Sequence, residues 1–363
     1  MTKPTVAVAF GGRSSEHGVS CVTAGGVLGA IDREKWNVVA LGITSEGRWT
    51  VASDDPGAWA IVDGALPTVA DDGETVLLPV SAGNRSWRVE GHDGSIRHLA
   101  DIDVVFPVLH GPFGEDGTLQ GALELLDIRY VGAGVLASAV GMDKQFMKTA
   151  FKDAGLPVTP DVVLYPGEHP EGHIADIEAL GLPLFVKPAR AGSSMGISRV
   201  DDLAELEAAV AEAVTHDPKV LIERGVSGRE IETAVLATET EVRVSPAGEI
   251  VTGGDYDFYD FEAKYLDDGD VRLLCPTTLP AGVADVVADY ARRAFRAVGA
   301  EGLARVDVFV SEDGVVTVNE INTMPGFTPS SMYPRMWASA GVEYPELVQV
   351  LLETALERRI GLR

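Results

Sequence analysis

Four polar residues near the C-terminal end of the chain are spaced so that they could hold divalent cations against a phosphate. Arg305 and Asp307 lie in one apolar run, and Glu320 and Asn322 lie in the next. Alternate side chains of a strand share a face, so each pair would point the same way. Two carboxylates and an amide oxygen suit Mg²⁺ beside nucleotide phosphates. A cross-strand salt bridge on a solvated face is the alternative, and the unusual loop that follows, TMPGFTPSSMYP, argues against it.

A lysine beside a glycine- and serine-rich loop is a second group suited to phosphate. Lys187 ends an apolar run and is followed by PARAGSSMGI. An ammonium group and the backbone N–H groups of such a loop donate to phosphate oxygens. A surface lysine is the alternative interpretation. The chain contains no Walker A sequence, so binding of ATP would need a different phosphate clamp.

Two further polar residues lie where apolar runs end. Glu16, in GGRSSEHGVS, lies at a predicted strand-to-helix turn, where the helix dipole alone already favours a carboxylate. The neighbouring His17 is expected to be exposed. His110, in HGPFGEDG, follows the C-terminal end of a predicted strand, which is where α/β sheets bind ligands. His110 is therefore the better placed of the two histidines.

Two other segments have patterns that admit two interpretations. Residues 258–270, FYDFEAKYLDDGD, form either a polar loop or a lid over the phosphates, and periodicity does not choose between them. Residues 132–137, GAGVLA, match the dinucleotide-binding fingerprint. Because glycine and alanine are abundant in this chain, a turn with close backbone packing is the better interpretation of that match.

The elements that must position these residues alternate between strands and helices, which predicts an α/β fold of three units with a parallel first sheet. Residues 54–100 are polar and weakly periodic, so we expect short strands and loops on an edge there. The other expected strands cover residues 6–10, 36–43, 103–109, 183–186, 219–223, 302–310 and 315–322. The expected helices begin near residue 15 and cover residues 118–126, 143–154, 203–214 and 282–298.

Composition limits the classes of partner. The chain has 363 residues, enough for two or three packed units, and is 46% hydrophobic and 23% charged, as in globular proteins. Its formal net charge of −26 repels phosphate backbones and anionic lipids, so we expect neither nucleic acid nor membrane as a partner. Without a signal peptide or a long apolar stretch, the predicted location is cytoplasmic. Cys21 and Cys275 are expected to be reduced, buried thiols.

Eight segments, taken in order, resemble the D-alanine:D-alanine ligases of the ATP-grasp group. They are FGGRSSEHGVS, HGPFGEDGTLQG, MDK, FVKPARAGSSMGIS, IERGVSGREIE, YDFEAKY, ARVDVF and NEINTMPGFTPSSMYP. The resemblance implies a three-domain ATP-grasp architecture with an N-terminal Rossmann-like parallel-sheet domain. Its domains would be residues 1–135, a central ATP-grasp subdomain over 136–225, and a C-terminal subdomain over 226–363 that carries the metal site and the lid.

The resemblance also implies contacts with ATP. The residues that would hold the phosphates, adenine and ribose are Lys144, Lys187, Ser193, Ser194, Glu223, Val226, Glu230, Phe258, Lys264 and Asn319. Among them Glu223 would face the adenine amino group and Glu230 the ribose hydroxyls. Two Mg²⁺ ions, or Mn²⁺, would be ligated by Asp307, Glu320 and Asn322.

Contacts with two molecules of D-alanine are implied in the same way. Glu16, with His110 nearby, would anchor the first ammonium group, and Ser331 with the backbone of Met332 would receive the second carboxylate. The implied catalytic residues are Glu16, Ser193, Tyr265, Arg305 and Gly326. The first three would close the lid, and the last two would hold the transition-state oxyanion. A homodimer is also implied.

Three other functions compete with dipeptide synthesis. A D-alanine:D-lactate ligase would share the scaffold, but the lid sequence EAKY, with Tyr265, is the dipeptide-type pattern. Another ATP-grasp ligase would keep Lys187 and the metal ligands while losing the surroundings of Glu16 and Ser331, and both are present. A non-catalytic nucleotide-binding protein would lack metal ligands, and none is missing.

Overall fold

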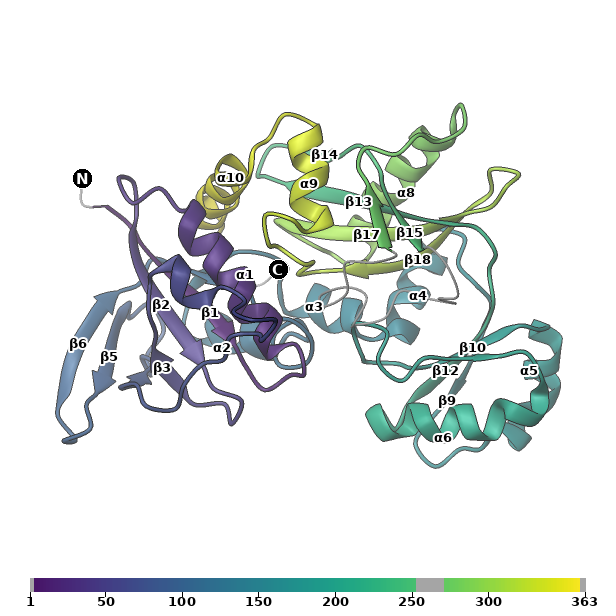
Figure 1. Ribbon diagram of the computed structural model, residues 1–363, viewed down its shortest axis with the longest axis horizontal. Coiled ribbons are helices and arrows are strands. Elements are labelled where there is room, and N and C mark those ends of the chain that lie inside the picture. The colour runs from purple at the N-terminus through teal and green to yellow at the C-terminus, as the bar shows by residue number, and fades with distance from the viewer. Residues whose placement is uncertain (1–2, 253–270, 360–363) are drawn as a thin grey trace.

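The structure is a computed structural model that describes residues 3–252 and 271–359, and it is built on three sheets (Figure 1). The N-terminal sheet has eight strands in the order β6-β5-β4-β3-β2-β1-β7-β8. They are β1 (Thr5–Gly11), β2 (Asn37–Ile43), β3 (Trp49–Val51), β4 (Thr75–Leu77), β5 (Ser86–Glu90), β6 (Ile96–Asp101), β7 (Val104–Pro107) and β8 (Arg129–Tyr130).

The N-terminal sheet is mixed rather than wholly parallel. The strands β2, β1, β7 and β8 pair in parallel, as predicted, and β1 is buried at every position. From β2 outwards through β3 to β6 the pairing is antiparallel. The connections from β2 to β3, from β4 to β5 and from β5 to β6 are too short for the crossover that parallel pairing requires, whereas the longer segment between β3 and β4 also joins antiparallel strands. The helices α1 (His17–Ala30) and α2 (Thr118–Leu125) complete this part of the chain.

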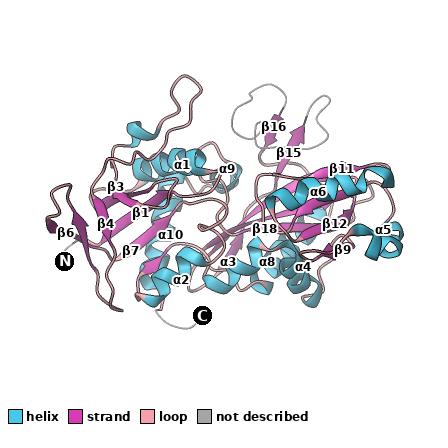
Figure 2. Ribbon diagram, turned by 90° about the horizontal axis from the view of Figure 1, so that it is seen from below, coloured by secondary structure: helices cyan, strands magenta, loops and turns pink. Residues whose placement is uncertain are grey.

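A four-stranded antiparallel sheet forms the central part, at the lower right of Figure 1. Its order is β11 (Ser198–Val200), β10 (Leu184–Pro188), β12 (Val220–Arg224) and β9 (Asp161–Leu164). Two helices accompany it, α5 (Ile174–Leu180) and α6 (Leu206–His216). The buried positions of α6 recur every three or four residues, so one face packs on the sheet (Figure 2).

The third sheet is antiparallel and has six strands. They are β16 (Val271–Leu274), β15 (Gly248–Thr252), β13 (Arg229–Ala237), β17 (Leu303–Val310) and β18 (Val316–Asn322) in that order, with β14 (Val242–Val244) pairing to β13. Helix α8 (Val283–Ala297) buries its apolar stripe against the sheet. The helices α3 (Val135–Met142) and α4 (Lys144–Asp153) link the first sheet to the other two.

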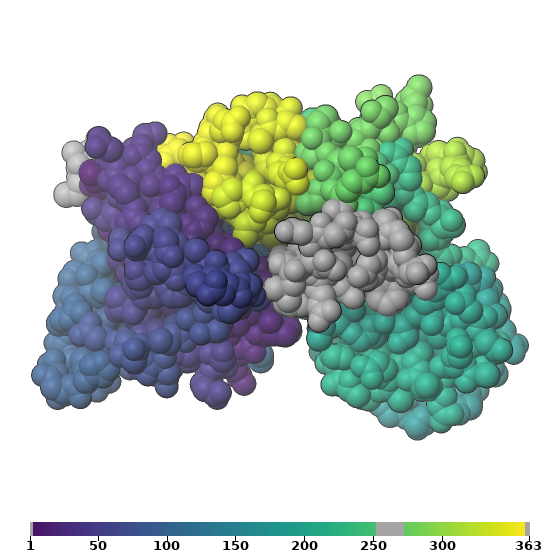
Figure 3. Space-filling view, viewed as in Figure 1, coloured from purple at the N-terminus to yellow at the C-terminus, as the bar shows by residue number. Residues whose placement is uncertain are grey.

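The chain ends by returning to the N-terminal sheet. Helix α9 (Met332–Ser339) packs on β13, and α10 (Tyr344–Glu357) lies beside α1 and β7 (Figure 1). One core cluster therefore contains residues from the first sheet, the third sheet and both terminal helices, including Phe106, Leu236, Met336 and Leu352. In Figure 3 the N-terminal and central parts form separate lobes that the C-terminal segment joins along one side.

The turn at GAGVLA and the two cysteines can be compared with their predictions. Gly132 has a left-handed φ of +98°, and a Cβ on Gly302 would lie 3.2 Å from its backbone nitrogen, which confirms a closely packed turn at GAGVLA. Cys21 is buried, as predicted, whereas Cys275 is only partly buried. In residues 3–252 and 271–359, no helix is both long and apolar enough to span a membrane.

Candidate active site

The strands β17 and β18 place the four polar residues of the predicted metal site directly opposite one another. Arg305 pairs in register with Asn322, and Asp307 pairs with Glu320. A β-bulge follows Asp307, where Asn319 is the extra residue on β18. The neighbouring positions Ala304, Val306 and Val308 are buried in the core, so the polar residues share the other face, as alternation predicts.

The guanidinium of Arg305 is held among carboxylates. Its Nε and Nη2 donate to the two oxygens of Asp307 at 2.7 and 2.6 Å, and Nε lies 3.2 Å from Glu232 Oε1. Burial opposes the charge of Arg305, but Asp307 and Glu232 outweigh it and raise its pKa well above the usual range. Arg305 therefore remains a cation next to the predicted metal ligands. Glu232, which is buried on β13, is not among the residues that the sequence singles out.

The donor atoms fit a hard divalent cation that also binds phosphate. Among the described residues, no group of three or more His, Cys, Asp and Glu side chains could hold a metal ion. Asp307 and Glu320 provide two carboxylates, and the third predicted ligand is the amide of Asn322, which such a grouping does not include. Two carboxylates and an amide leave coordination positions for phosphate oxygens and water, as Mg²⁺ sites usually do.

Of the predicted phosphate-binding lysines, Lys144 lies close to Glu320 on β18, and Lys187 lies close to Lys144. Lys144, the first residue of α4, donates from Nζ to Ala191 O at 2.7 Å, in the glycine-serine loop. Burial lowers the pKa of Lys144, opposed chiefly by the nearby charge of Glu320, while Lys187 adds to the lowering. Lys187 forms an ion pair with Glu223, a residue predicted to contact adenine. Lys144 on α4 therefore lies between Glu320 of the third sheet and Lys187 of the central sheet.

The start of α1 meets the glycine-serine loop. Ser193 Oγ donates to Glu16 Oε1 at 2.5 Å, across 177 residues of sequence. Ser193 and Ser194 have φ values of 48° and 57°, a left-handed conformation that is strained for residues other than glycine and that shapes this loop. Glu16 and Ser193 are two of the three residues predicted to close the lid, and they contact each other here.

The loop HGPFGEDG holds the segment after β18. The Nδ1 of His110 donates to Met324 O at 3.1 Å, and Glu115 accepts from Met324 N at 3.1 Å and from Gly111 N at 2.6 Å. Burial lowers the pKa of His110, although the charge of Glu16 opposes this. Burial, followed by the charge of Glu16, raises the pKa of Glu115 to about 8. The sequence contains Glu115 within a recognised motif, but nothing in its spacing shows that it reaches Met324.

The prediction for His17 is wrong, because this residue is buried instead of exposed. Its Nδ1 lies 2.7 Å from Gly12 O, and its Nε2 accepts from Val69 N at 3.0 Å. Val69 lies in the polar, weakly periodic segment 54–100, so the sequence does not predict that it contacts His17. His17 therefore fixes the turn that precedes Glu16.

The loop between β18 and α9 contains the residues predicted to bind the second amino acid. Ser331 immediately precedes α9, and its Oγ lies 2.7 Å from the hydroxyl of Thr328. Met332 is the first residue of the helix and is buried. Gly326 is half-buried in the same loop. These positions follow Met324 directly, so the contacts of His110 and Glu115 orient the loop that carries them.

The remaining predicted ATP contacts lie in or beside β13 or outside the described residues. Val226 is half-buried between β12 and β13, and Glu230 is exposed at the start of β13. Phe258, Lys264 and Tyr265 lie outside the described residues.

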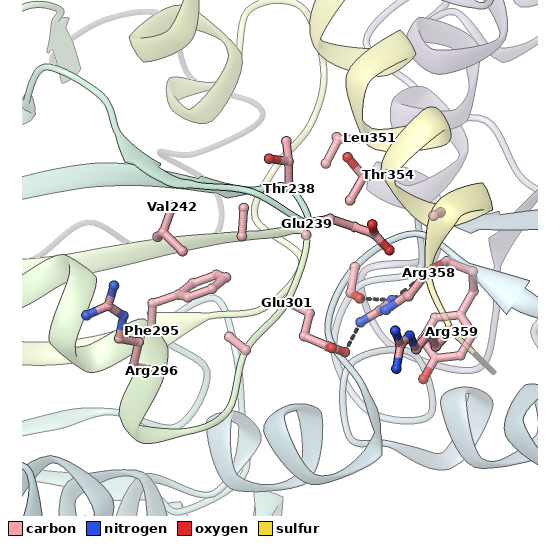
Figure 4. A pocket seen from close by; sticks show the side chains of 16 residues that line it. Thr238, Glu239, Val242, Phe295, Arg296, Glu301, Leu351, Thr354, Arg358 and Arg359 are labelled. Carbon is pink, nitrogen blue, oxygen red and sulfur yellow. Dashed lines mark hydrogen bonds and ion pairs between the residues drawn. The ribbon is translucent and has the colours of Figure 1, made fainter. Parts of the chain in front are cut away.

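A cavity of about 540 Å³ lies elsewhere, between β8, the end of β13 and α10 (Figure 4). None of the predicted site residues lines it. Arg358 crosses it, forming an ion pair with Glu301 and donating to the backbone of Tyr130 and Gly132. These contacts tie α10 to both neighbouring sheets, so we assign this cavity no part in the chemistry.

Known proteins resemble this chain along its whole length. The family model described as D-ala D-ala ligase N-terminus matches residues 5–133, and the model described as D-ala D-ala ligase C-terminus matches residues 150–353. A D-alanine–D-alanine ligase of Kineococcus radiotolerans is 57% identical, covering 99% of both chains. One of Streptomyces avermitilis is 53% identical, covering 99% of this chain and 96% of the relative.

Solved structures of ligases also match this chain over nearly its full length. The VanG D-Ala:D-Ser ligase from Enterococcus faecalis has a TM-score of 0.85 at 33% identity, with 98% of this chain and 100% of the other covered. The D-alanine–D-alanine ligase from Coxiella burnetii has a TM-score of 0.83 at 33% identity, with 99% and 95% covered. The fold is therefore that of the ATP-grasp ligases, and the chain belongs to the D-alanine–D-alanine ligase family.

Proposed function

We propose that this site joins two molecules of D-alanine into D-alanyl-D-alanine, with ATP as the energy source, for peptidoglycan precursor synthesis. The observation that carries the proposal is the hydrogen bond between Glu16 and Ser193. It brings the predicted amino-acid anchor against the predicted phosphate loop, beside Lys144 and the polar face of β17 and β18. An amino acid and a triphosphate would therefore meet at one place.

The first step would form an acyl phosphate. A carboxylate oxygen of the first D-alanine forms a bond to the γ-phosphorus as the bond to the bridging oxygen breaks, releasing ADP. Two anions must approach each other, so positive charge at Lys144 and Lys187 lowers the barrier. Asp307, Glu320 and Asn322 would hold two Mg²⁺, or Mn²⁺, which when bound would neutralise phosphate charge.

The second step would form the peptide bond. The neutral amine of the second D-alanine attacks the acyl carbon, and the tetrahedral intermediate then loses one amine proton and releases inorganic phosphate, so that the products are the amide and hydrogen phosphate. Arg305 remains charged in its carboxylate surroundings and would stabilise the oxyanion together with the backbone of Gly326. The segment after β18 is held by His110 and Glu115, which orients Gly326 and Ser331.

The proposal is tested by identifying the product. Incubation with ATP, Mg²⁺ and D-alanine should yield the dipeptide by mass spectrometry, with one ADP formed per peptide bond. L-alanine should release far less phosphate, and equal or absent release would contradict the proposal. D-lactate as the second substrate is the less favoured alternative, because the curated relatives at 53–57% identity carry the D-alanine–D-alanine name. A cytoplasmic homodimer remains part of the proposal, and light scattering of the purified protein tests the dimer.

A substitution next to Glu16 tests the placement of the amino-acid anchor. Gly111 has φ +73°, and a Cβ there would lie 2.7 Å from Glu16 Oε2. We expect Gly111→Ala to displace this carboxylate and to lower kcat/KM for D-alanine by roughly tenfold to a hundredfold. Gly121→Ala is the matched control, because a Cβ at Gly121 in α2 meets nothing within 4 Å. Steady-state kinetics give kcat/KM for D-alanine in both variants. Equal kcat/KM values in Gly111→Ala and Gly121→Ala would contradict the placement of Glu16 at the amino-acid site.

A further inference from the structure

Lys148 is a fully buried lysine that none of the proposed steps uses. It lies on α4, and its side chain is 2% exposed. Its Nζ lies 2.5 Å from Glu223 Oε1, 3.0 Å from Thr159 Oγ1 and 3.1 Å from Asp161 Oδ1. An ammonium group has three donors, so each of them has an acceptor here. A lysine held in this way cannot turn toward another partner without leaving buried acceptors unpaired.

Glu223 is the carboxylate that Lys148 holds, and it is itself only 5% exposed. One oxygen faces Lys148, and the other faces Lys187. Burial raises the pKa of Glu223, but the charges of Lys187 and Lys148 outweigh burial and hold the pKa below its usual value. Without such partners a buried carboxylate tends to take up a proton.

Lys187 can move away from Glu223 more readily than Lys148 can. Among the described residues, Glu223 is the only ion-pair partner of Lys187, and Lys187 is one of the two lysines proposed to bind ATP phosphates. Once Lys187 turns to a phosphate, Lys148 is the one ion-pair partner that Glu223 keeps among the described residues. Lys148 stays, because Thr159 and Asp161 hold its other two donors.

We propose that Lys148 is a positioning and specificity-determining residue that keeps Glu223 a hydrogen-bond acceptor for the amino group of adenine; this rests on the proposed ATP site. An ionised carboxylate only accepts hydrogen bonds, whereas a protonated one also donates. Adenine carries an amino donor where guanine carries a carbonyl acceptor. An ionised Glu223 therefore attracts adenine and repels guanine, and loss of Lys148 weakens that discrimination.

Nucleotide binding measured without D-alanine tests this role. We expect Lys148→Met to lower the ratio of ATP to GTP affinity, measured by calorimetry, by about tenfold to a hundredfold. The matched control is Lys152→Met, one turn further along α4. Lys152 also pairs with Asp161, at 2.8 Å, but its side chain is 52% exposed, and the described ion pairs of Glu223 are with Lys148 and Lys187 instead. This control should keep the wild-type ratio, and an unchanged ratio in Lys148→Met would overturn the proposal.

A double-mutant cycle separates positioning from general damage. In a Glu223→Gln background, Lys148→Met should change the ratio no further, because the carboxylate on which it acts is gone. If Lys148→Met lowers the ratio of ATP to GTP affinity as much in this background as in the wild type, the proposal is overturned. If Lys148→Met does not fold, Thr159→Val removes one acceptor of the ammonium group and should lower the ratio severalfold. An unchanged ratio in a folded Thr159→Val variant also overturns it.

The same measurements distinguish this inference from the proposed function. Absence of ATP binding to the wild-type protein would defeat the proposed function. Normal ATP binding and dipeptide formation, with the ATP to GTP ratio unaffected by Lys148→Met, would defeat only the role of Lys148.

Discussion

Glu320→Gln is expected to lower kcat for dipeptide formation by about a thousandfold or more, because the variant loses one of two carboxylates proposed to hold the metal ions. Glu320 stands opposite Asp307 on the neighbouring strand. Glutamine keeps the shape but removes the charge. The charge of Glu320 is repelled by Asp307 but attracted by Lys144 and Arg305, so we expect the melting temperature to change little. Loss of activity without loss of stability would point to a functional carboxylate.

The control for this variant lies on the same hairpin. Asp313 is exposed in the turn between β17 and β18 and accepts a hydrogen bond from Ser311. Asp313→Asn makes the same change of charge at the far end of the two strands, and its kcat should match the wild type. Titration with Mn²⁺ in the presence of ADP adds a second measurement. Unchanged Mn²⁺ affinity in Glu320→Gln would rule out this carboxylate as a ligand.

Arg305→Lys has the second largest expected effect. Lysine keeps the positive charge but not the planar fork that contacts Asp307 and Glu232. If Arg305 stabilises the oxyanion, kcat should fall by about a hundredfold to a thousandfold while the affinity for ATP changes little. Rapid-quench measurement of the chemical step, with calorimetry for ATP, would test both parts.

A comparable arginine in the same sheet provides the control. Arg229 contacts both oxygens of Glu249 at 2.8 and 2.6 Å, at the start of β13. Arg229→Lys loses a similar bidentate pair without touching the proposed site, so it should cost stability and leave kcat nearly unchanged. If the two variants lose activity equally, the effect of Arg305→Lys is general weakening of the sheet, and its proposed role is wrong.

Local patterns in the sequence predicted the polar face of β17 and β18 correctly. The period of two in a strand is a property of the backbone, so Arg305 with Asp307 and Glu320 with Asn322 needed only adjacent strands to meet. The buried β1 and the amphipathic α6 and α8 follow from equally local patterns. These features depend on residues close in sequence, which is why they could be predicted.

Contacts between distant segments were not predictable from those patterns. His17 was expected to be exposed, but a backbone group 52 residues away covers it. Glu115 reaches Met324 across 209 residues, and Glu232 reaches Arg305 from another strand. The antiparallel half of the first sheet depends on how short polar strands pair, and their sequences specify register only weakly.

The sequence alone determined the family, the α/β alternation and the residue types that face the site, because motifs and periodicity depend on residues that are close together in the sequence. Only the tertiary structure decided which charges neutralise one another. Lys148 is an ordinary helical lysine in the sequence, and it becomes the partner of Glu223 because α4 docks where β9 begins and β12 ends. Burial makes such pairings costly to break, and burial is a property of the folded chain.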